Sequence, residues 1–349
     1  MRRMRPVPLT GRPKVSVVIP CYNYGHFLPR AVQSVLEQPG VDVQIIVVDD
    51  ASSDGSARIA EEISVAEPRV AAVVHEANAG HIATYNDGLS RCTGDYVVLL
   101  SADDLLAPGA LARAAALFEA RPGLALVYGR APSFSEEPPR PVKRPVSWTI
   151  WSGPEWIERI CRRGTNVIAN PEAIVRREVV ERLGGYDPRL PHTADLYFWL
   201  QAATFGRVGR IDGPPQAYYR IHGGNMHLGE DDLSDLVERS QMFELFLSSP
   251  QLAAMALSAR TALAREALAR ATREYDLGRG HGPLVAKYLD FAHEQGVELD
   301  GLNGWSALQR RQTFAESVLA QKALSIVGRA HRRMCTTAEL ARIRRTGVA

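Results

Sequence analysis

The stretch Tyr96-Val-Val-Leu-Leu-Ser-Ala-Asp-Asp104 decides the fold, because an uninterrupted apolar run ends abruptly in two acids. A short run of this kind, rich in Val and Leu, predicts a strand that is buried on both faces. Open sheets of parallel strands bind ligands outside the carboxyl ends of their strands. The stretch therefore predicts a central element of the core and, directly after it, one edge of a functional site.

Four more runs of the same kind surround this stretch. They are Val15–Ile19, Ile45–Val48, Val70–Val74 and Leu124–Tyr128. Between them lie helical patterns, such as the apolar stripe within residues 27–36 that follows i, i+3, i+4 and i+7 spacing. Strands that alternate with helices predict right-handed βαβ units. We therefore predict an α/β fold with a Rossmann-like, mostly parallel sheet and helices on both faces.

The chain changes character after the first two thirds. Residues 178–185 and 195–205 keep helical spacing, and residues 216–220 have the pattern of a last strand. Beyond about residue 230 the sequence is rich in Ala, Leu, Arg and Glu, has helical periodicity and contains few strand formers. These features predict an α-helical C-terminal region.

The composition excludes several classes of protein. With 349 residues, 46% of them hydrophobic and 23% charged, the chain is typical of a globular protein. The net charge of +2 is the sum of +5 over residues 1–14, +6 over residues 321–349 and −9 over the rest, and an acidic body does not favour binding to nucleic acid. No apolar run approaches the roughly 18 residues that span a bilayer. Four scattered cysteines and no signal segment predict a cytoplasmic protein.

Two pairs of acids follow two of the predicted strands. Asp49 and Asp50 end one strand, and Asp103 and Asp104 follow another. Four carboxylates on one edge repel one another unless a cation or hydrogen-bond donors lie among them. Clustered carboxylates favour Mg²⁺ or Mn²⁺, whereas a single pair more often caps the following helix. Because two pairs share one edge, we favour a site for a divalent cation and a nucleotide.

Seven segments carry a resemblance to a known family. They are Val15-Ser-Val-Val-Ile-Pro-Cys-Tyr-Asn23, Ile46-Val-Val-Asp-Asp-Ala-Ser-Ser-Asp-Gly-Ser56, Asn78-Ala-Gly80 with Asn86-Asp-Gly88, Gly94-Asp-Tyr-Val-Val-Leu-Leu-Ser-Ala-Asp-Asp104, Gly184-Gly-Tyr-Asp187, Ala194-Asp-Leu-Tyr-Phe-Trp-Leu200 and Tyr219-Arg-Ile-His-Gly-Gly-Asn225. In this order they resemble the family-two nucleotide-sugar glycosyltransferases, which have the GT-A fold. The resemblance covers residues 14–226, which would form the transferase domain. Residues 227–349 would shape the acceptor site, mediate homo-oligomerisation or contact a membrane peripherally.

The resemblance implies a metal-dependent transferase that moves a hexosyl or N-acetylhexosaminyl group from a nucleotide-diphosphate donor, most often a UDP-sugar, to an acceptor hydroxyl. The acceptor stays open among saccharides, lipid-linked molecules and secondary metabolites. Direct displacement inverts the anomeric configuration and needs a base on the face opposite the leaving diphosphate. Asp195 matches the position of this catalytic base, although Thr193 and Ala194 stand where the family often has an acid.

The resemblance also implies a donor site. Pro20 and Tyr22 would border the nucleobase, and Asp50 would accept a hydrogen bond from its ring. Asp103 occupies the last position of the family's Asp-x-Asp motif and would ligate Mg²⁺ or Mn²⁺, with His222 closing on the metal or the diphosphate.

One departure from the motif is Ser101, which replaces the first Asp and adds no charge at the donor site. Asp104 would compensate for it or cap the helix predicted after it. The departure keeps a second interpretation open, namely a nucleotide-sugar-binding or scaffold protein of the same fold with impaired catalysis. A nucleotidyltransferase is disfavoured, because no Gly-rich triphosphate loop follows the first strand. Trp148, Trp151 and Trp156 fit either stacking on a sugar or burial in the core.

Overall fold

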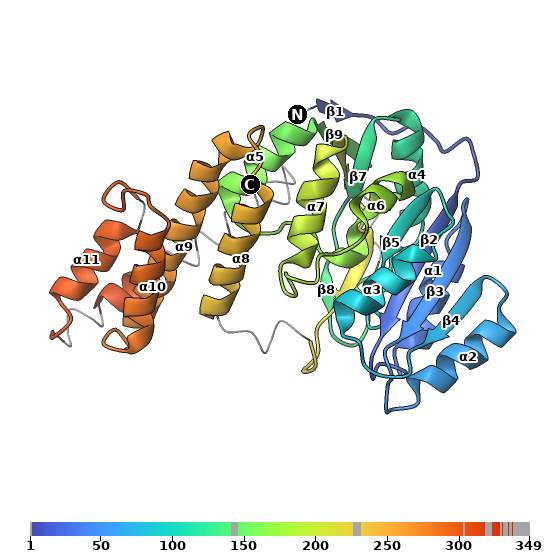
Figure 1. The fold of residues 1–349 in the computed structure, drawn as a ribbon, viewed down its shortest axis with the longest axis horizontal. Helices are drawn as coiled ribbons and strands as arrows, with labels where there is room; N and C mark the ends of the chain where they lie inside the picture. The colour runs from blue at the N-terminus through green and yellow to red at the C-terminus, as the bar shows by residue number, and fades with distance from the viewer. Residues whose placement is uncertain are drawn as a thin grey trace. The chain divides into compact units, whose positions relative to one another are not determined.

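The computed structural model describes residues 2–140, 146–225, 232–302, 304–317 and 323–328, and residues 330, 334 and 337. The chain forms two compact units (Figure 1). Residues 1–156 and 168–228 make an α/β unit, and residues 157–167 and 229–349 make a helical unit. The helical C-terminal region is therefore confirmed. That residues 157–167 belong with it was not indicated by the sequence.

The α/β unit is built on a nine-stranded sheet with the order β1-β9-β11-β7-β10-β5-β2-β3-β4. The strands are β1 (Arg2–Met4), β2 (Lys14–Cys21), β3 (Asp42–Asp49), β4 (Val70–Val74), β5 (Tyr96–Leu99), β7 (Leu124–Tyr128), β9 (Ser147–Trp151), β10 (Ile174–Arg176) and β11 (Arg207–Asp212). Strands β5, β2, β3 and β4 are parallel neighbours, and β11 is parallel to β7. Because β10 and β9 pair antiparallel with their neighbours, the sheet is mixed.

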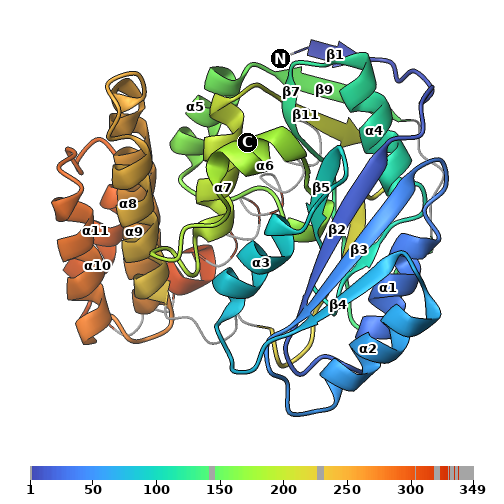
Figure 2. The same cartoon turned by 45° about the vertical axis from the view of Figure 1, so that its right-hand side comes forward.

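Helices cover both faces of this sheet, which confirms the predicted fold class. Figure 2 shows α3 (His81–Ser90) on the opposite side of β2 and β3 from α1 (Leu28–Leu36) and α2 (Ser56–Ala66). Successive side chains of a strand point to opposite faces of the sheet, so an uninterrupted apolar run makes both faces apolar. On β5, Val98 joins the core beneath α1 and α4 (Ala110–Ala120). Val97 and Leu99 face the other way, towards α6 (Arg177–Leu183) and α7 (Ala194–Thr204).

A second, three-stranded sheet brings distant parts of the chain together. Its order is β6 (Leu105–Leu106), β12 (Ala217–Arg220) and β8 (Ser133–Phe134). Strand β12 runs antiparallel to β6 and parallel to β8. It therefore places the residues after β12 beside the acids that precede β6.

The three neighbouring tryptophans belong to the core. Trp148, Trp151 and Trp156 are each at most 1% exposed. The ring of Trp151 stacks on that of Tyr128, and the Trp156 indole nitrogen lies 3.4 Å from the Tyr128 hydroxyl oxygen. Stacking of these rings on a sugar is therefore excluded.

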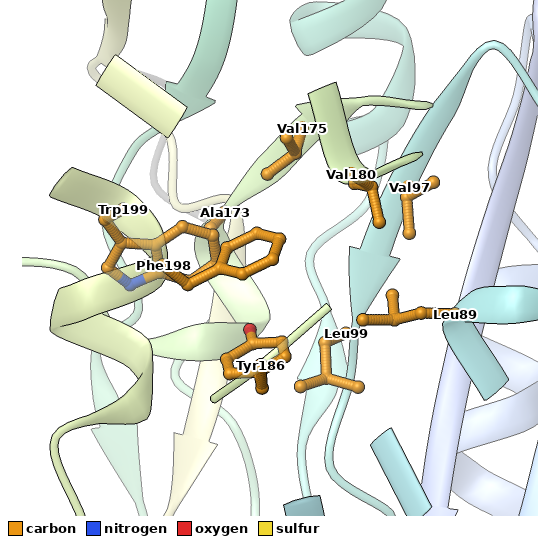
Figure 3. A pocket seen from close by; sticks show the side chains of 9 residues that line it. All are labelled: Leu89, Val97, Leu99, Ala173, Val175, Val180, Tyr186, Phe198 and Trp199. Carbon is orange, nitrogen blue, oxygen red and sulfur yellow. The ribbon is translucent and has the colours of Figure 1, made fainter. Parts of the chain in front are cut away.

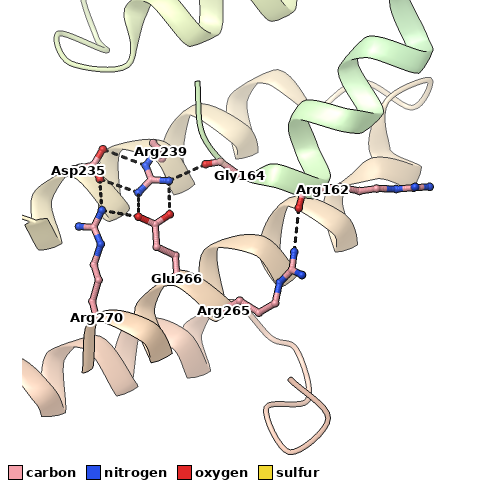
Figure 4. Close-up of polar contacts among 7 residues, drawn as sticks. All are labelled: Arg162, Gly164, Asp235, Arg239, Arg265, Glu266 and Arg270. Carbon is pink, nitrogen blue, oxygen red and sulfur yellow. Dashed lines mark hydrogen bonds and ion pairs between the residues drawn. The ribbon is translucent and has the colours of Figure 1, made fainter. Parts of the chain in front are cut away.

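The helical unit contains α8 (Asp232–Phe246), α9 (Ala256–Asp276), α10 (Pro283–Glu294) and α11 (Trp305–Thr313). Helix α5 (Gly153–Arg163) begins in the α/β unit and ends in this one. The guanidinium of Arg239 is buried between the carboxylates of Asp235 and Glu266, and Arg270 pairs with the same two acids (Figure 4). A buried cation is tolerated only when it is paired in this way. No helix in the described ranges is long and apolar enough to cross a bilayer.

The contact between α3 and the sheet depends on Gly88. A methyl group at this position would overlap Cγ1 of Val18 and lie 3.2 Å from Cγ2 of Val48. Ala in a helix interior is ordinarily about 1 kcal/mol more favourable than Gly. Here the overlap with two β-branched core residues outweighs that gain, so we expect Gly88→Ala to lower the free energy of unfolding by about 1–3 kcal/mol.

Urea unfolding of both proteins measures this loss. Gly123→Ala is the matched control, because no atom lies within 4 Å of its added methyl group. A Gly88→Ala protein as stable as the wild type would contradict the proposed close approach of α3.

Candidate active site

The candidate site lies at the carboxyl ends of β2, β3 and β5, where three loops meet. The loops after β2 and β3 are joined by their own polar groups. Asp49 accepts hydrogen bonds from the Ser52 amide (3.0 Å) and the Ser52 hydroxyl (2.6 Å), and the Asn23 amide donates to that hydroxyl (2.9 Å). Both Asn23 and Ala51 have positive φ angles. The Asp49 carboxylate therefore builds the loops, and the sequence-based view of it as part of a four-acid metal cluster is not supported.

Asp50 points to the loop between β4 and α3. Its two oxygens accept hydrogen bonds from the amides of Ala79 (2.8 Å) and Gly80 (3.0 Å), and His75 Nδ1 lies 2.8 Å from Oδ1. Burial alone would raise the pKa of Asp50, but these hydrogen bonds outweigh it and hold the pKa below its ordinary value. Asp50 is therefore an ionised carboxylate at the edge of the site.

The predicted nucleobase residues flank this position. Pro20 is the penultimate residue of β2 and is half-buried, and the Tyr22 side chain is 51% exposed. An exposed aromatic ring offers an apolar face with one polar end to a planar ligand.

Asp103 and His222 come together from positions 119 residues apart in sequence. His222 Nε2 lies 2.9 Å from Asp103 Oδ2, and the side chains are 20% and 7% exposed. Strand β12 positions His222 for this contact. Its last residue, Arg220, donates a hydrogen bond from Nε to the Asp103 carbonyl oxygen (2.8 Å). The Arg220 guanidinium is sandwiched between the rings of Phe27 and Phe134.

A second contact holds the loop that carries His222. The Tyr24 hydroxyl donates to the carbonyl oxygen of Gly224 (2.9 Å), and the rings of Tyr24 and His222 meet edge to face at 5.3 Å. The loop after β2 thereby fixes the loop after β12, although about 200 residues separate them in sequence. Tyr24 was not identified from the sequence.

Asp104 is buried beside Asp103 and is not a helix cap. Residues 105–106 form β6 and helix α4 begins only at Ala110. The alternative prediction, that Asp104 caps the helix after it, is therefore wrong. Its Oδ1 accepts a hydrogen bond from the Arg220 amide (2.8 Å), whereas Oδ2 is buried without a hydrogen-bond partner. Burial, and then the charge of Asp103, raise the pKa of Asp104. Ser101 lies in the turn after β5, where its carbonyl oxygen accepts the Asp104 amide (3.0 Å).

This corner has the donor types that a divalent cation needs. Asp103 and His222 supply a carboxylate oxygen and an imidazole nitrogen, which suit Mn²⁺ and, for the oxygen, Mg²⁺. The unpartnered oxygen of Asp104 is buried next to Asp103, and a bound cation would favour the ionised form of this carboxyl group. Across the described residues no three His, Cys, Asp or Glu side chains converge as a metal cage. A cation here would therefore take further oxygens from a ligand such as a diphosphate.

Asp195, the predicted base, lies in the first turn of α7. Asn170 Nδ2 donates to its Oδ1 (3.0 Å), and the Tyr186 hydroxyl lies 3.3 Å from the Asn170 amide oxygen. Burial raises the pKa of Asp195 to about 6, although the hydrogen bond from Asn170 opposes the rise. A carboxyl group with such a pKa can accept a proton near neutral pH. The supporting residue Asn170 was missed because it lies in a short 3₁₀ turn far from Asp195 in sequence.

Tyr85 on α3 links the two halves of the site. Burial raises its pKa, and the charges of Asp195 and then Asp103 raise it further. Its ring meets those of His81 and Tyr186 at 5.5 Å. The Tyr85 hydroxyl is therefore within electrostatic reach of both carboxylates. No motif in the sequence had indicated it.

An apolar pocket is lined by residues of β5, β10, α6 and α7 (Figure 3). The stacked rings of Tyr186 and Phe198, 4.5 Å apart, form part of its wall. Its lining residues are Leu89, Val97, Leu99, Ala173, Val175, Val180, Tyr186, Phe198 and Trp199. Because this lining carries no cationic side chain, the pocket does not suit a diphosphate and belongs to the core that supports Asp195.

A mixed sheet with helices on both faces and acids at the carboxyl ends of its strands is the arrangement expected of the GT-A fold. The chain belongs to glycosyltransferase family 2, whose model matches residues 16–184. An uncharacterized glycosyltransferase of Nostoc sp. is 30% identical over 225 residues, which cover 62% of this chain and 67% of that protein. Three further relatives, 26–31% identical, are matched over 16–66% of their own lengths.

Solved structures share the fold. S. aureus TarS 1-349 in complex with UDP-GlcNAc has a TM-score of 0.64 at 17% identity, and the match covers 92% of each chain. The mannosyltransferase PcManGT from Pyrobaculum calidifontis, in complex with GDP-Man and Mn²⁺, has a TM-score of 0.51 at 19% identity and covers 94% of this chain and 89% of that one. The expected family and the GT-A fold are both confirmed.

The raised pKa of Asp195 predicts a pH-dependent cost to stability. Between the ordinary value of 3.8 and about 6 the folded protein binds more protons than the unfolded chain, so stability falls as pH rises through this window. Asp195→Asn removes the cost of burying the charge. We expect this variant to be more stable than the wild type by about 1–3 kcal/mol at pH 7.

Denaturant unfolding at several pH values tests this, with Asp290→Asn, at an exposed position of α10, as the control. The difference between Asp195→Asn and wild type should shrink below about pH 5. A difference that does not change with pH would show that Asp195 is not a desolvated carboxylate.

Proposed function

We propose that the protein is a metal-dependent, inverting glycosyltransferase that moves a sugar from a UDP-sugar to an acceptor hydroxyl, with a hexosyl or N-acetylhexosaminyl group as the sugar. The observation that carries this proposal is made at Tyr85: beyond the effect of burial, the charges of a candidate base, Asp195, and of a candidate metal ligand, Asp103, both raise the pKa of its hydroxyl. A displacement at the anomeric carbon needs these two groups on opposite sides of the reacting bond.

At the donor end, Pro20, Tyr22 and Asp50 would bind the nucleobase. Asp50 keeps one free acceptor position, on Oδ2, because a carboxylate accepts about four hydrogen bonds and three are accounted for. An ionised acceptor at this position suits a ring N–H donor such as that of uracil. Support for uridine also comes from TarS, which was solved with UDP-GlcNAc, whereas PcManGT was solved with GDP-Man.

Asp103 and His222 would hold the divalent cation, Mg²⁺ or Mn²⁺. Bound there, the cation would supply Lewis acidity to the leaving diphosphate. The residues of this chain position that corner. Arg220 and Tyr24 hold the loops that carry the two ligands, and Asp104 and Ser101 shape the turn that presents Asp103.

Asp195 would act as the base. Near neutral pH its carboxylate is ionised yet basic enough to take the proton of an acceptor hydroxyl. Asn170 orients it through one oxygen, Oδ1, which leaves Oδ2 for the acceptor. Because one base serves one displacement, the anomeric configuration would invert. We further propose a saccharide, a lipid-linked molecule or a secondary metabolite as the acceptor, a role for residues 227–349 in shaping its site, and a cytoplasmic location.

Nucleotide binding should depend on the metal and on Asp103. We expect UDP to raise the melting temperature of the wild type in the presence of Mn²⁺ or Mg²⁺ and to do so more than GDP or dTDP. Chelation of the metal, or Asp103→Asn, should remove most of the shift. Thermal unfolding with each nucleotide, with and without metal, measures it, and a shift that is indifferent to metal would contradict the metal site.

Transfer activity should depend on Asp195. We expect Asp195→Asn to lower kcat by about 10²–10⁴-fold and to leave the UDP-induced thermal shift intact, because the base acts only on the acceptor. Donor-sugar hydrolysis or transfer to a panel of saccharides, lipid-linked sugars and small hydroxyl compounds provides the assay. Asp290→Asn is again the control.

The pH profile gives the second readout of the same role. The rate should rise with pH on an acidic limb near pH 6, where Asp195 loses its proton. Asn170→Ala removes a hydrogen bond to the carboxylate and should move this limb to higher pH. A protein that binds UDP but transfers no sugar to any acceptor, with or without Asp195, would favour the scaffold interpretation.

A further inference from the structure

A chain of four charged side chains leads from the nucleobase edge to the surface of α3. His75 follows β4 and lies between two carboxylates, with Nδ1 2.8 Å from Asp50 Oδ1 and Nε2 3.3 Å from Asp87 Oδ2. Arg91, the residue that caps the C-terminal end of α3, pairs with the same Asp87 at 3.0 Å. The order of the side chains is therefore carboxylate, imidazole, carboxylate, guanidinium.

Burial increases from the outside of this chain of groups towards the site. The side chains of Arg91, Asp87, His75 and Asp50 are 49%, 28%, 17% and 4% exposed. The inner pair is thus shielded from solvent and from salt, which strengthens the interaction between its members. The backbone of His75 is also fixed, because its amide donates to the Asp49 carbonyl oxygen at 2.9 Å.

Both ring nitrogens of His75 face carboxylate oxygens. Only the protonated ring can donate to both, because a neutral imidazole carries one N–H and presents a lone pair at its other nitrogen. In the neutral state one of the two contacts would set a lone pair against a carboxylate. The geometry therefore favours an imidazolium between Asp50 and Asp87.

We propose that His75 is a positioning residue for the donor nucleotide: its imidazolium holds the Asp50 carboxylate in the orientation that meets the nucleobase, so that nucleotide affinity depends on pH through His75. The role rests on the proposed function, because Asp50 is the nucleobase contact there. None of the segments that carry the family resemblance contains His75.

The sign of the pH dependence follows from the contacts. The hydrogen bond to Asp50, against the effect of burial, and then the one to Asp87 raise the pKa of His75 above 6.5. A raised pKa means that the contribution of the imidazolium is fully present below the ordinary value and is lost as pH rises through the raised one. The charged groups that face His75 are Asp50 from the end of β3 and Asp87 from α3, with Arg91 behind Asp87.

Titration calorimetry with UDP and Mg²⁺ from about pH 6.5 to about pH 8.5 tests the proposal. We expect the wild-type affinity for UDP to fall about 5–20-fold over this pH range, because one charge-assisted hydrogen bond is lost. His75→Gln should bind as weakly at low pH as the wild type does at high pH and should show little pH dependence. The matched control is His293→Gln, an exposed histidine of α10, which should behave as the wild type.

Asp87→Asn separates positioning from a general structural role. It leaves His75 in place but removes one of its two carboxylates, so the midpoint of the affinity change should move to lower pH. In assays of transfer the effect of His75→Gln should appear in KM for the donor, with kcat almost unchanged.

A measurement on the wild type avoids any variant that fails to fold. Because coupling is reciprocal, UDP must raise the pKa of His75 if the imidazolium favours UDP, and NMR of the histidine ring protons reports that pKa directly. An unchanged His75 titration on addition of UDP, or a His75→Gln protein with wild-type affinity and pH dependence, overturns the proposal while nucleotide binding stands. A wild type that binds no nucleotide overturns the proposed function as well.

Discussion

The structure depends on one constraint, which is that carboxylates at the ends of buried strands must be hydrogen-bonded or paired. A desolvated carboxylate without donors is strongly unfavourable. Ser52 satisfies Asp49, the amides of residues 79–80 satisfy Asp50, and the Arg220 amide satisfies one oxygen of Asp104. Each of these partners lies in a different segment of the chain. The acids thus determine how the loops around the site fold.

Where the constraint is not fully met, the residue is available for function. Asp195 has one hydrogen-bond donor and a raised pKa, and Asp104 has a buried oxygen without a partner. Both features are unfavourable for the folded protein by themselves. They persist because the surrounding core is well packed, and strained or underpaired groups of this kind are common at sites of chemistry.

The return of the chain through β12 is the second condition for the site. Asp103 and His222 are 119 residues apart in sequence, and Tyr24 and Gly224 are 200 apart. Arg220 makes the junction rigid, because its guanidinium is held by two aromatic rings and its Nε–H binds the Asp103 carbonyl. The corner proposed for the metal is therefore a product of sheet topology as much as of the acids themselves.

The sequence by itself determined the α/β class, the positions of the central strands, the helical C-terminal region and the family, because apolar periodicity and ordered motifs are local properties of the chain. It also indicated Asp50, Asp103, Asp195 and His222. Only the tertiary structure decided which acids are already satisfied, that Asn170 and Tyr85 adjoin Asp195, and that His75 lies between two carboxylates. These interactions join different helices, strand ends and loops, and no local pattern specifies them.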